Sequence, residues 1–274
     1  QIVHERLGLD PSNVQYIDGD TDRVGYGMGT MGSRSAVIGG TALWTAAEKV
    51  IAKGKKIAAH MLEAAAADIV FADGRFSVTG TDRSVGIVEV ARAAFVPGKF
   101  PPDLEGGLYE TGTFSPTADT YPNGCHICEV EIDEETGVVA LVRYLVIDDV
   151  GTVINPLGLK GQIHGGIAQG VGQALMEQVV YDRESGQLLT GSFMDYCMPR
   201  ADTFCNVTIH SRPVPTKLNP LGAKGAGEAG TVGALPVVMN AVLDALAPLG
   251  VRELDMPATS ERVWHAIRAA KASH

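Results

Sequence analysis

Hydrophobic and polar positions along this chain follow two periods, one typical of helices and one typical of strands. In the longest helical stretch, Val37, Trp44, Ile51 and Ala58 recur at helical spacing. The same spacing predicts helices over residues 1–8, 35–66, 85–94, 160–177 and 235–247, and a last helix that begins at Thr259 or Ser260. The stretch 35–66 fits one long helix or two helices joined at Lys53–Lys56.

Strict alternation predicts two hairpins. The first covers residues 69–78 and turns at Asp73-Gly74, a pair that suits a two-residue turn. The second covers residues 126–151. A strand at 14–17 and two or three strands between 179 and 210 complete the prediction. Because helices and strands are mixed without an internal repeat, the predicted fold class is α+β (mixed α/β), with two lobes that separate near residues 100–125.

Composition narrows the classes of function. The 274 residues carry a net charge of −10 at pH 7, which argues against a nucleic-acid or anionic-membrane partner. No apolar run approaches the roughly 18 residues of a membrane span. Four cysteines in a chain of this length do not make a disulfide framework, so we expect a reducing cytoplasm. The opening QIVHERLGLDP reads as the middle of a helix, which predicts that the chain begins partway through a longer protein or follows a processing cut.

Two glycine-rich segments match G-x-G-x-x-G, Gly27–Gly32 and Gly225–Gly230. A dinucleotide fingerprint needs a buried strand directly before its glycines, and neither segment has one. The first segment nevertheless opens the helix predicted from residue 35, so free N–H groups, two hydroxyls and the Arg34 guanidinium group are placed for a pyrophosphate. A helix cap at Ser33 or Ser35, with Arg34 paired to a surface acid, explains the same residues equally well.

The second glycine-rich segment places Lys224 and Glu228 among glycines and alanines. Glycines on both sides let another body approach the backbone, and a carboxylate held there suits a general base. Lys224 would either weaken Glu228 as a base, if the two side chains lie close together, or orient a ligand. The alternative for Glu228 is a solvated surface acid, which is the usual position of this residue type.

The helix predicted at 160–177 combines Gln162 with several glycines, each of which costs about 1 kcal/mol relative to alanine. Close packing of another helix explains that cost, and so does a cofactor bonded by a glutamine amide. The stretch Cys125-His126-Ile127-Cys128 resembles half of a zinc knuckle, but no second C-x-x-C follows. Strand alternation also sends the two thiols to opposite faces, which argues against a metal site.

Five segments, taken in order, resemble one family. They are DGDTD…GTMGSRS, VEIDEETGVV…DDVGTVINPLGLKGQIHGGIAQGVGQAL, DYCMPRAD, NPLGAKGAGEAGTVGALPVVMNAVLDAL and MPATSERVWHAI. Together they are similar to the C-terminal portion of the molybdenum-binding subunit of the xanthine dehydrogenase, aldehyde oxidase and aerobic carbon monoxide dehydrogenase family. The resemblance implies that residues 1–274 form the C-terminal part of a molybdenum-cofactor-binding domain.

That resemblance implies an oxidoreductase that hydroxylates a carbon centre with water. In the family, the dithiolene of a molybdopterin cofactor holds the molybdenum, often as the cytosine dinucleotide in bacteria, and a glutamate acts as base. By position, that glutamate is Glu228, with Gly227 beside it near the metal. Gln162 matches the glutamine that hydrogen-bonds the cofactor, and Lys224 takes a supporting role. The segment that matches the phosphate-holding part of the family is Gly32, Ser33, Arg34, Ser35 and Ala36.

The family builds its site from two halves, and the first half would precede Gln1. The resemblance therefore implies a hetero-oligomer with the missing N-terminal half of the molybdenum subunit as a partner. It also implies [2Fe-2S] and FAD on other subunits, because the four cysteines here are too few and wrongly spaced for the clusters. The substrate stays open among purines, aldehydes, N-heterocycles and carbon monoxide. Two alternatives remain: a catalytically silent scaffold relative, and a nucleotide-binding enzyme that uses Gly225–Gly230.

Overall fold

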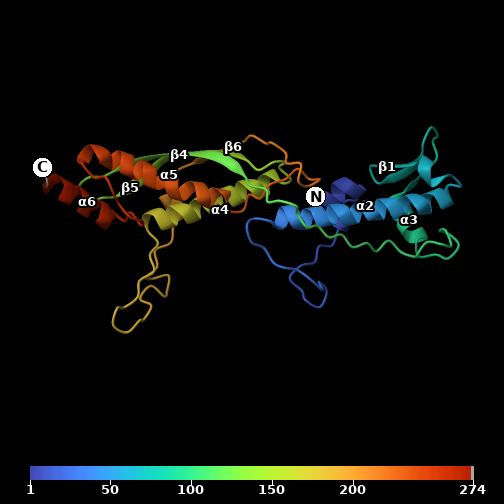
Figure 1. Cartoon of the computed structure of the whole chain (residues 1–274), viewed down its shortest axis with the longest axis horizontal. Coiled ribbons are helices and arrows are strands. Elements are labelled where there is room, and N and C mark those ends of the chain that lie inside the picture. Colours follow the sequence, from blue (N-terminus) through green and yellow to red (C-terminus); the bar gives the residue numbers. More distant parts are fainter. Residues whose placement is uncertain (273–274) are drawn as a thin grey trace. The chain divides into compact units, whose positions relative to one another are not determined.

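The computed structural model describes residues 1–272, which divide into two compact units (Figure 1). The first unit contains Gln1–Asp119 and Lys217–Ala223. The second contains Thr120–Thr216 and the residues from Lys224 onward. Each unit has its own three-stranded sheet and its own buried core. Both mix helices with strands, so the predicted mixed class is confirmed.

The first unit is organised around one long helix that packs beside a small antiparallel sheet. Its elements are α1 (Ile2–Leu7), α2 (Ser35–Met61), β1 (Ile69–Ala72), β2 (Arg75–Val78), β3 (Ser84–Gly86) and α3 (Ile87–Ala93). The core centres on Phe76 and Ile57, which are fully buried. Gly54 of α2 lies directly against the Phe76 ring, so a glycine is needed where helix and sheet meet.

The second unit is a sheet with a helical layer on it. Its elements are β4 (Asn123–Ile132), β5 (Val139–Asp149), α4 (Pro156–Leu175), β6 (Val207–Ser211), α5 (Ala229–Leu246) and α6 (Ser260–Ala272). The strand order is β4-β5-β6, with β4 antiparallel and β6 parallel to β5. Helix α5 packs against both α4 and β4. Tyr144, Ile163 and Val238 are buried between these layers.

Several predicted elements are confirmed. Both hairpins form, and Asp73 and Gly74 have φ angles of 46° and 75°, as a two-residue turn of the mirror-image type requires. The helix predicted at 35–66 is one continuous helix, α2, which ends at Met61. Helix α4 begins at Pro156, earlier than residue 160, because the Asn155 side chain accepts a hydrogen bond from the Gly158 N–H and caps it.

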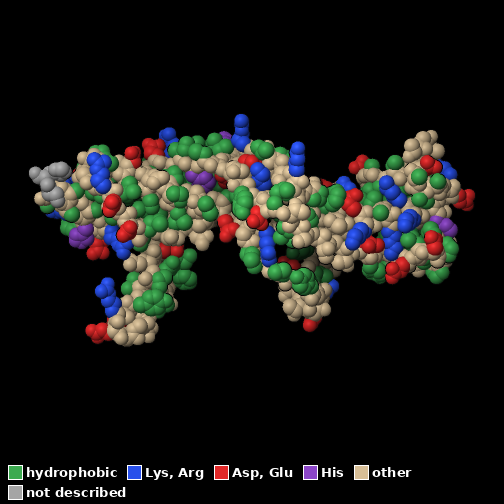
Figure 2. Space-filling model, viewed as in Figure 1, with side chains coloured by type: hydrophobic (Ala, Val, Ile, Leu, Met, Phe, Trp, Pro, Cys, Tyr) green, Lys and Arg blue, Asp and Glu red, His purple; other side chains and the backbone are tan. Residues whose placement is uncertain are grey.

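Other predictions were wrong. Residues 14–17 form no strand, and Tyr16 is 74% exposed, because no neighbouring strand lies beside them to pair with. Between 179 and 210, only β6 joins a sheet, apart from one isolated bridge between Tyr181 and Leu188. The rest of that segment is irregular and exposes apolar side chains such as Phe193. Figure 2 shows hydrophobic side chains, in green, along the extended loop that Figure 1 draws in yellow after α4.

Helix α5 also differs from its prediction, because it begins at Ala229 and not near residue 235. Residues 229–249 are long and apolar enough to cross a membrane by length and composition, so the expectation that no such run exists was wrong. One helix of this kind is weak evidence for a span. Within its own unit α5 packs on α4 and on β4, which buries Ala234, Val238 and Leu246, whereas Val232 is 69% exposed.

Candidate functional site

Glu228 stands at the start of α5. It is the N-cap residue, and its carbonyl oxygen accepts the helix's first hydrogen bond from the Val232 N–H at 3.0 Å. Glu228 is an exposed residue. An anionic side chain at this helix end is favoured by the partial positive charge of the unpaired N–H groups. The end of the second glycine-rich segment, from Ala229, is therefore helical, and Glu228 directly precedes this helix.

The crossing of α4 and α5 brings Glu228 near Gln162. A Cβ atom on Gly230 would lie 2.5 Å from the Ile163 carbonyl oxygen, so the two backbones are in direct contact there. The Thr231 hydroxyl donates a hydrogen bond of 3.0 Å to the carbonyl oxygen of Gly166 in α4. Because Gln162 precedes Ile163 and Glu228 lies two residues before Gly230, both exposed residues lie at the same end of the crossing.

This contact also explains part of the glycine content of α4. Gly166 and Gly170 face α5 so closely that an added Cβ would lie 2.8 Å from the Thr231 nitrogen and 2.6 Å from the Ala234 Cβ, respectively. Helix packing therefore accounts for these two. Gly161 and Gly165 have no atom within 4 Å of an added Cβ, so packing within the described chain does not account for them.

Lys224 anchors the segment that leads to Glu228. Its backbone N–H donates to the Val150 carbonyl oxygen at 2.8 Å, and its Nζ lies 2.5 Å from Asp149 Oδ2. The other Asp149 oxygen accepts hydrogen bonds from the Gly151 and Val214 N–H groups, both at 2.8 Å. Burial raises the pKa of Asp149, but Lys224 and the two N–H groups outweigh it and bring the pKa below its usual value. The Lys224 ammonium group is thus already engaged inside the fold.

The predicted phosphate segment, Gly32–Ala36, lies in the first unit. Arg34 is the N-cap residue of α2, and its guanidinium group donates to the carbonyl oxygens of Met28 and Gly29 at 2.9 and 3.0 Å. No capping hydrogen bond from the Arg34 side chain forms, and the hydroxyls of Thr30 and Ser35 bond to each other. Arg34 therefore holds the preceding loop against the helix entrance. The alternative in which Arg34 pairs with a surface acid is therefore wrong, because backbone carbonyl oxygens are its partners.

The first glycine-rich loop presents bare backbone. Gly27, Gly29 and Gly32 have no atom within 4 Å of an added Cβ. Gly29 and Gly32 adopt φ angles of 66° and 60°, in the left-handed region that favours glycine. Backbone N–H groups next to the start of α2 are therefore accessible to an anionic group.

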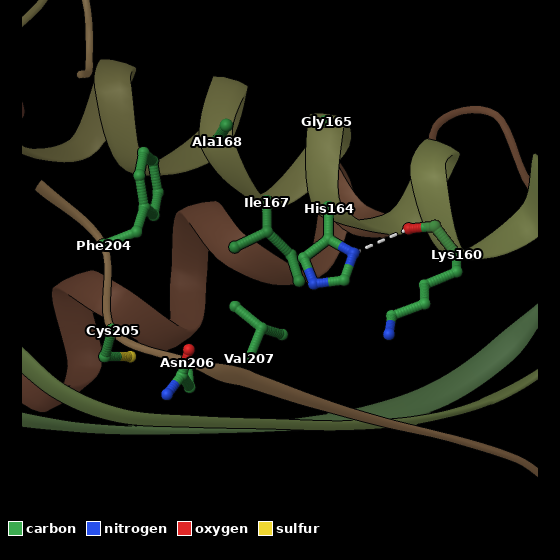
Figure 3. A pocket seen from close by; sticks show the side chains of 9 residues that line it. All are labelled: Lys160, His164, Gly165, Ile167, Ala168, Phe204, Cys205, Asn206 and Val207. Carbon is green, nitrogen blue, oxygen red and sulfur yellow. Dashed lines mark hydrogen bonds between the residues drawn. The ribbon is translucent and has the colours of Figure 1, made fainter. Parts of the chain in front are cut away.

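One pocket lies where the sequence predicted none (Figure 3). It has a volume of about 570 Å³ and lies between α4 and the segment before β6. In Figure 3, His164 and Lys160 extend from α4 toward Asn206 and Val207. His164 Nδ1 lies 2.8 Å from the Lys160 carbonyl oxygen, which only accepts, so Nδ1 carries the proton. The spacing of Lys160 and His164, one helical turn apart, was the available signal.

The structure brings Gln162, Lys224, Gly227 and Glu228 into one unit and places Gly32–Ala36 in the other. Among residues 1–272, no three His, Cys, Asp or Glu side chains gather closely enough to hold a metal ion. Cys125 is exposed, whereas Cys128 is half-buried on the inner face of β4. Burial, with the charge of Cys205, raises the pKa of the Cys128 thiol to about 11, which keeps it protonated near neutral pH.

Comparison with known proteins decides the family. The model of the molybdopterin cofactor-binding domain matches residues 1–204. The chain belongs to the molybdopterin cofactor-binding domain family. The resemblance inferred from the five segments is thereby confirmed.

Relatives support the same assignment. Over 98% of this chain, 40% of residues are identical to the carbon monoxide dehydrogenase large chain of Hydrogenophaga pseudoflava, of which 33% is covered. Over 99% of the chain, 38% are identical to the nicotine 6-hydroxylase large subunit of Paenarthrobacter nicotinovorans, again covering 33% of it. A solved structure of reconstituted CO dehydrogenase from Oligotropha carboxidovorans matches with a TM-score of 0.93 and 36% identity, over 100% of this chain and 34% of that one. The chain thus spans about a third of the length of these relatives.

Proposed function

We propose that this chain supplies part of the cofactor site of a molybdenum hydroxylase, with Glu228 as general base. The observation that carries the proposal is the crossing of α4 and α5, which holds Glu228 and Gln162 at one end of the same unit, both exposed. Two polar groups that converge at one end of a packed helix pair can contact one ligand. Membership of the molybdopterin cofactor-binding domain family supports a molybdopterin cofactor as that ligand.

Each unit, taken by itself, carries groups of the kind that such a cofactor needs. The open backbone of the first glycine-rich loop suits the phosphate end, with Gly32, Ser33, Arg34, Ser35 and Ala36 as its contacts. We expect the cytosine dinucleotide form, whose added phosphate extends the anionic part that a helix entrance attracts. Gln162 would donate from its amide, and Gly227 leaves room beside Glu228. Lys224 would act through its bond to Asp149, which fixes the approach to Glu228.

The bound cofactor supplies the two-electron chemistry that oxidises the substrate carbon, with water as the oxygen source. The chain's own contribution is to take a proton. The carboxylate of Glu228 is the proposed acceptor, and it stands at the N-cap position of α5. Proton abstraction by a positioned base contributes typically about 10²–10⁴-fold to a rate.

The proposal includes partners, because this chain spans about a third of relatives that are named large chains or subunits. We propose a cytoplasmic hetero-oligomer in which the N-terminal half of the molybdenum subunit completes the site. Subunits with [2Fe-2S] clusters and FAD would remove the electrons. Relatives named for carbon monoxide and for nicotine show how far substrates vary at similar identity. The proposed substrate is therefore a small molecule with an oxidisable carbon.

The test is Glu228→Gln in the enzyme assembled with its remaining parts and loaded with molybdenum. The amide has nearly the shape of the carboxylate and accepts no proton at neutral pH. We expect unchanged molybdenum content, measured by metal analysis, and turnover reduced by about 10²–10⁴-fold. Glu261→Gln is the matched control, because the Glu261 side chain is 83% exposed on α6. Near-wild-type turnover by Glu228→Gln would refute the assignment.

Two alternatives make different predictions. A silent scaffold relative would purify without molybdenum or pterin even beside a complete partner. A nucleotide-binding enzyme would need the Gly225–Gly230 backbone for a pyrophosphate, yet Gly230 is already pressed against the Ile163 carbonyl oxygen. Saturable binding of NAD or NADP in a calorimeter would support that enzyme, and we expect none.

A further inference from the structure

Three polar side chains are buried together under α5. His126 comes from β4, and Tyr144 and Asp148 come from β5. The side chains of His126 and Asp148 are only 6% and 5% exposed, and Tyr144 is 1% exposed. His126 Nδ1 lies 2.7 Å from the Tyr144 hydroxyl oxygen, and its Nε2 lies 3.5 Å from Asp148 Oδ1. The proposed site makes no direct use of these three groups.

Both ring nitrogens of His126 have a polar neighbour. A proton on Nε2 would face the Asp148 carboxylate, and Nδ1 shares a hydrogen bond with the Tyr144 hydroxyl. Burial, and then the charges of Cys128 and Asp148, raise the pKa of Tyr144 above its usual range, so the hydroxyl keeps its proton. These two contacts hold the imidazole in one orientation.

This arrangement is costly. Asp148 Oδ2 is buried and has no hydrogen-bond partner among the described residues. An unsatisfied buried acceptor destabilises a fold, and apolar side chains of the same shape would often serve stability as well. A buried polar group kept at such a cost points to a requirement for one defined geometry.

The imidazole lies directly beneath α5. A Cβ atom added to Gly233 would lie 2.5 Å from His126 Cε1 and 2.6 Å from its Nδ1. Carbon atoms pack at about 3.5–4.0 Å, so no side chain fits between the helix and the ring. Three residues earlier, on a neighbouring part of the same helix face, Gly230 is pressed against the backbone of α4. The first turns of α5 therefore rest on both the His126 ring and the backbone of α4.

Glu228 is tied to this point of contact. Its carbonyl oxygen accepts from the Val232 N–H, which belongs to the residue next to Gly233. The distance at which α5 rests on the His126 ring therefore determines the position of Glu228. We propose that His126, fixed by Tyr144 and Asp148, is a positioning residue for the Glu228 base. This inference rests on the function proposed above and adds to it the element that sets the base's position.

The first experiment adds a methyl group at the contact. Gly233→Ala, in the assembled and molybdenum-loaded enzyme, has to lift α5 from the ring. A misplacement of about 1 Å can cost 10²-fold in rate, so we expect kcat to fall by about 100-fold. KM and molybdenum content should not change, because Gly233 touches neither substrate nor cofactor in this proposal. Gly39→Ala is the matched control: it adds the same methyl group to helix α2 at a position where no atom lies within 4 Å, and it should leave kcat unchanged.

The second experiment removes the ring. In His126→Ala the helix loses its support, and kcat should fall by about 10-fold at unchanged KM. Combining it with Gly233→Ala lets the methyl group occupy part of the space that the ring leaves. We expect the double variant to recover at least about 10-fold in kcat over Gly233→Ala alone. A purely structural role would change the unfolding midpoint but would leave kcat per bound molybdenum near wild type in each variant.

The outcomes separate this inference from the proposed function. Wild-type kcat in Gly233→Ala, with Glu228→Gln inactive, overturns the positioning role and leaves the base assignment intact. Wild-type kcat in both overturns the base assignment. If Gly233→Ala does not fold, His126→Ala decides: wild-type kcat and KM there would overturn the inference.

Discussion

The two glycine-rich segments share a motif and differ in what surrounds them. In the first, Gly27, Gly29 and Gly32 have no atom within 4 Å of an added side chain. In the second, Gly230 is pressed against the backbone of α4, and Gly233, just beyond the motif, against the His126 ring. The first segment leaves open space at its glycines, whereas the second uses its last glycine, Gly230, for packing within its own unit.

The comparison shows why a glycine motif alone is ambiguous. Both segments satisfy G-x-G-x-x-G and both lead into a helix. Only the surrounding atoms tell whether a missing side chain makes room for a ligand or for a neighbouring helix. Substitutions that add a methyl group to each segment therefore test the difference directly.

The largest expected effect on stability is at the packed segment. Gly230→Ala places a methyl group 2.5 Å from the Ile163 carbonyl oxygen and 2.9 Å from the Ile167 nitrogen, both backbone atoms that cannot rotate away. Overpacking of this kind costs typically about 1–3 kcal/mol, and we expect the upper end. The free energy of unfolding in urea measures it. A variant as stable as the parent would show that α4 and α5 are not in close contact.

The anchor of the same segment comes next. Lys224→Met leaves Asp149 near the interior without its cation. Removing one partner of a fully buried pair costs about 3–5 kcal/mol. Here both side chains keep 12–14% of their surface exposed, so we expect about 2 kcal/mol in the free energy of unfolding. A loss of less than about 0.5 kcal/mol in the free energy of unfolding would show that the Lys224–Asp149 pair contributes no more than an ordinary surface ion pair.

The same pair predicts a pH dependence. The folded pKa of Asp149 lies below its ordinary value of 3.8. Its contribution to stability is therefore complete above that value and is lost as the pH falls through the lower, folded pKa. The free energy of unfolding of the parent should decrease as the pH falls through this acid range, and that of Asp149→Asn should decrease less. Equal slopes for both proteins would contradict the lowered pKa.

The smallest effects are expected in the open segment, and two glycines there separate backbone conformation from space. Gly29 has a φ angle of 66°, where an alanine costs roughly 1 kcal/mol, whereas Gly27 has no positive φ. Both face open space. Gly29→Ala should lower the free energy of unfolding by about 1 kcal/mol, and Gly27→Ala should be close to neutral. A large loss in Gly27→Ala would show that this loop is packed after all.

Local patterns were sufficient where local chemistry decides the structure. Asp73-Gly74 predicted its turn because both residues tolerate positive φ angles. The strand predicted at 14–17 failed because alternation carries no information about a partner strand. The start of α5 was missed because glycines that pack against α4 look the same in sequence as glycines of a loop.

For the site, the residue types were visible and their surroundings were not. Glu228 and Gln162 stood out by their glycine-rich context, but only the crossing of α4 and α5 shows that they lie at the same end. His126 was read only as part of a possible zinc knuckle. Two signals were available: His126 faces inward on its strand, as Cys128 does, and a further glycine, Gly233, follows Gly230 in the sequence.

The most direct test is a crystal structure of the assembled enzyme with its molybdenum cofactor bound. The account predicts that the Glu228 carboxylate lies within hydrogen-bond reach, about 2.6–3.2 Å, of a ligand atom on the metal. It also predicts that Gln162 contacts the same cofactor and that residues 32–36 surround its phosphate. A Glu228 side chain directed into bulk solvent, with no contact to the cofactor, would contradict it.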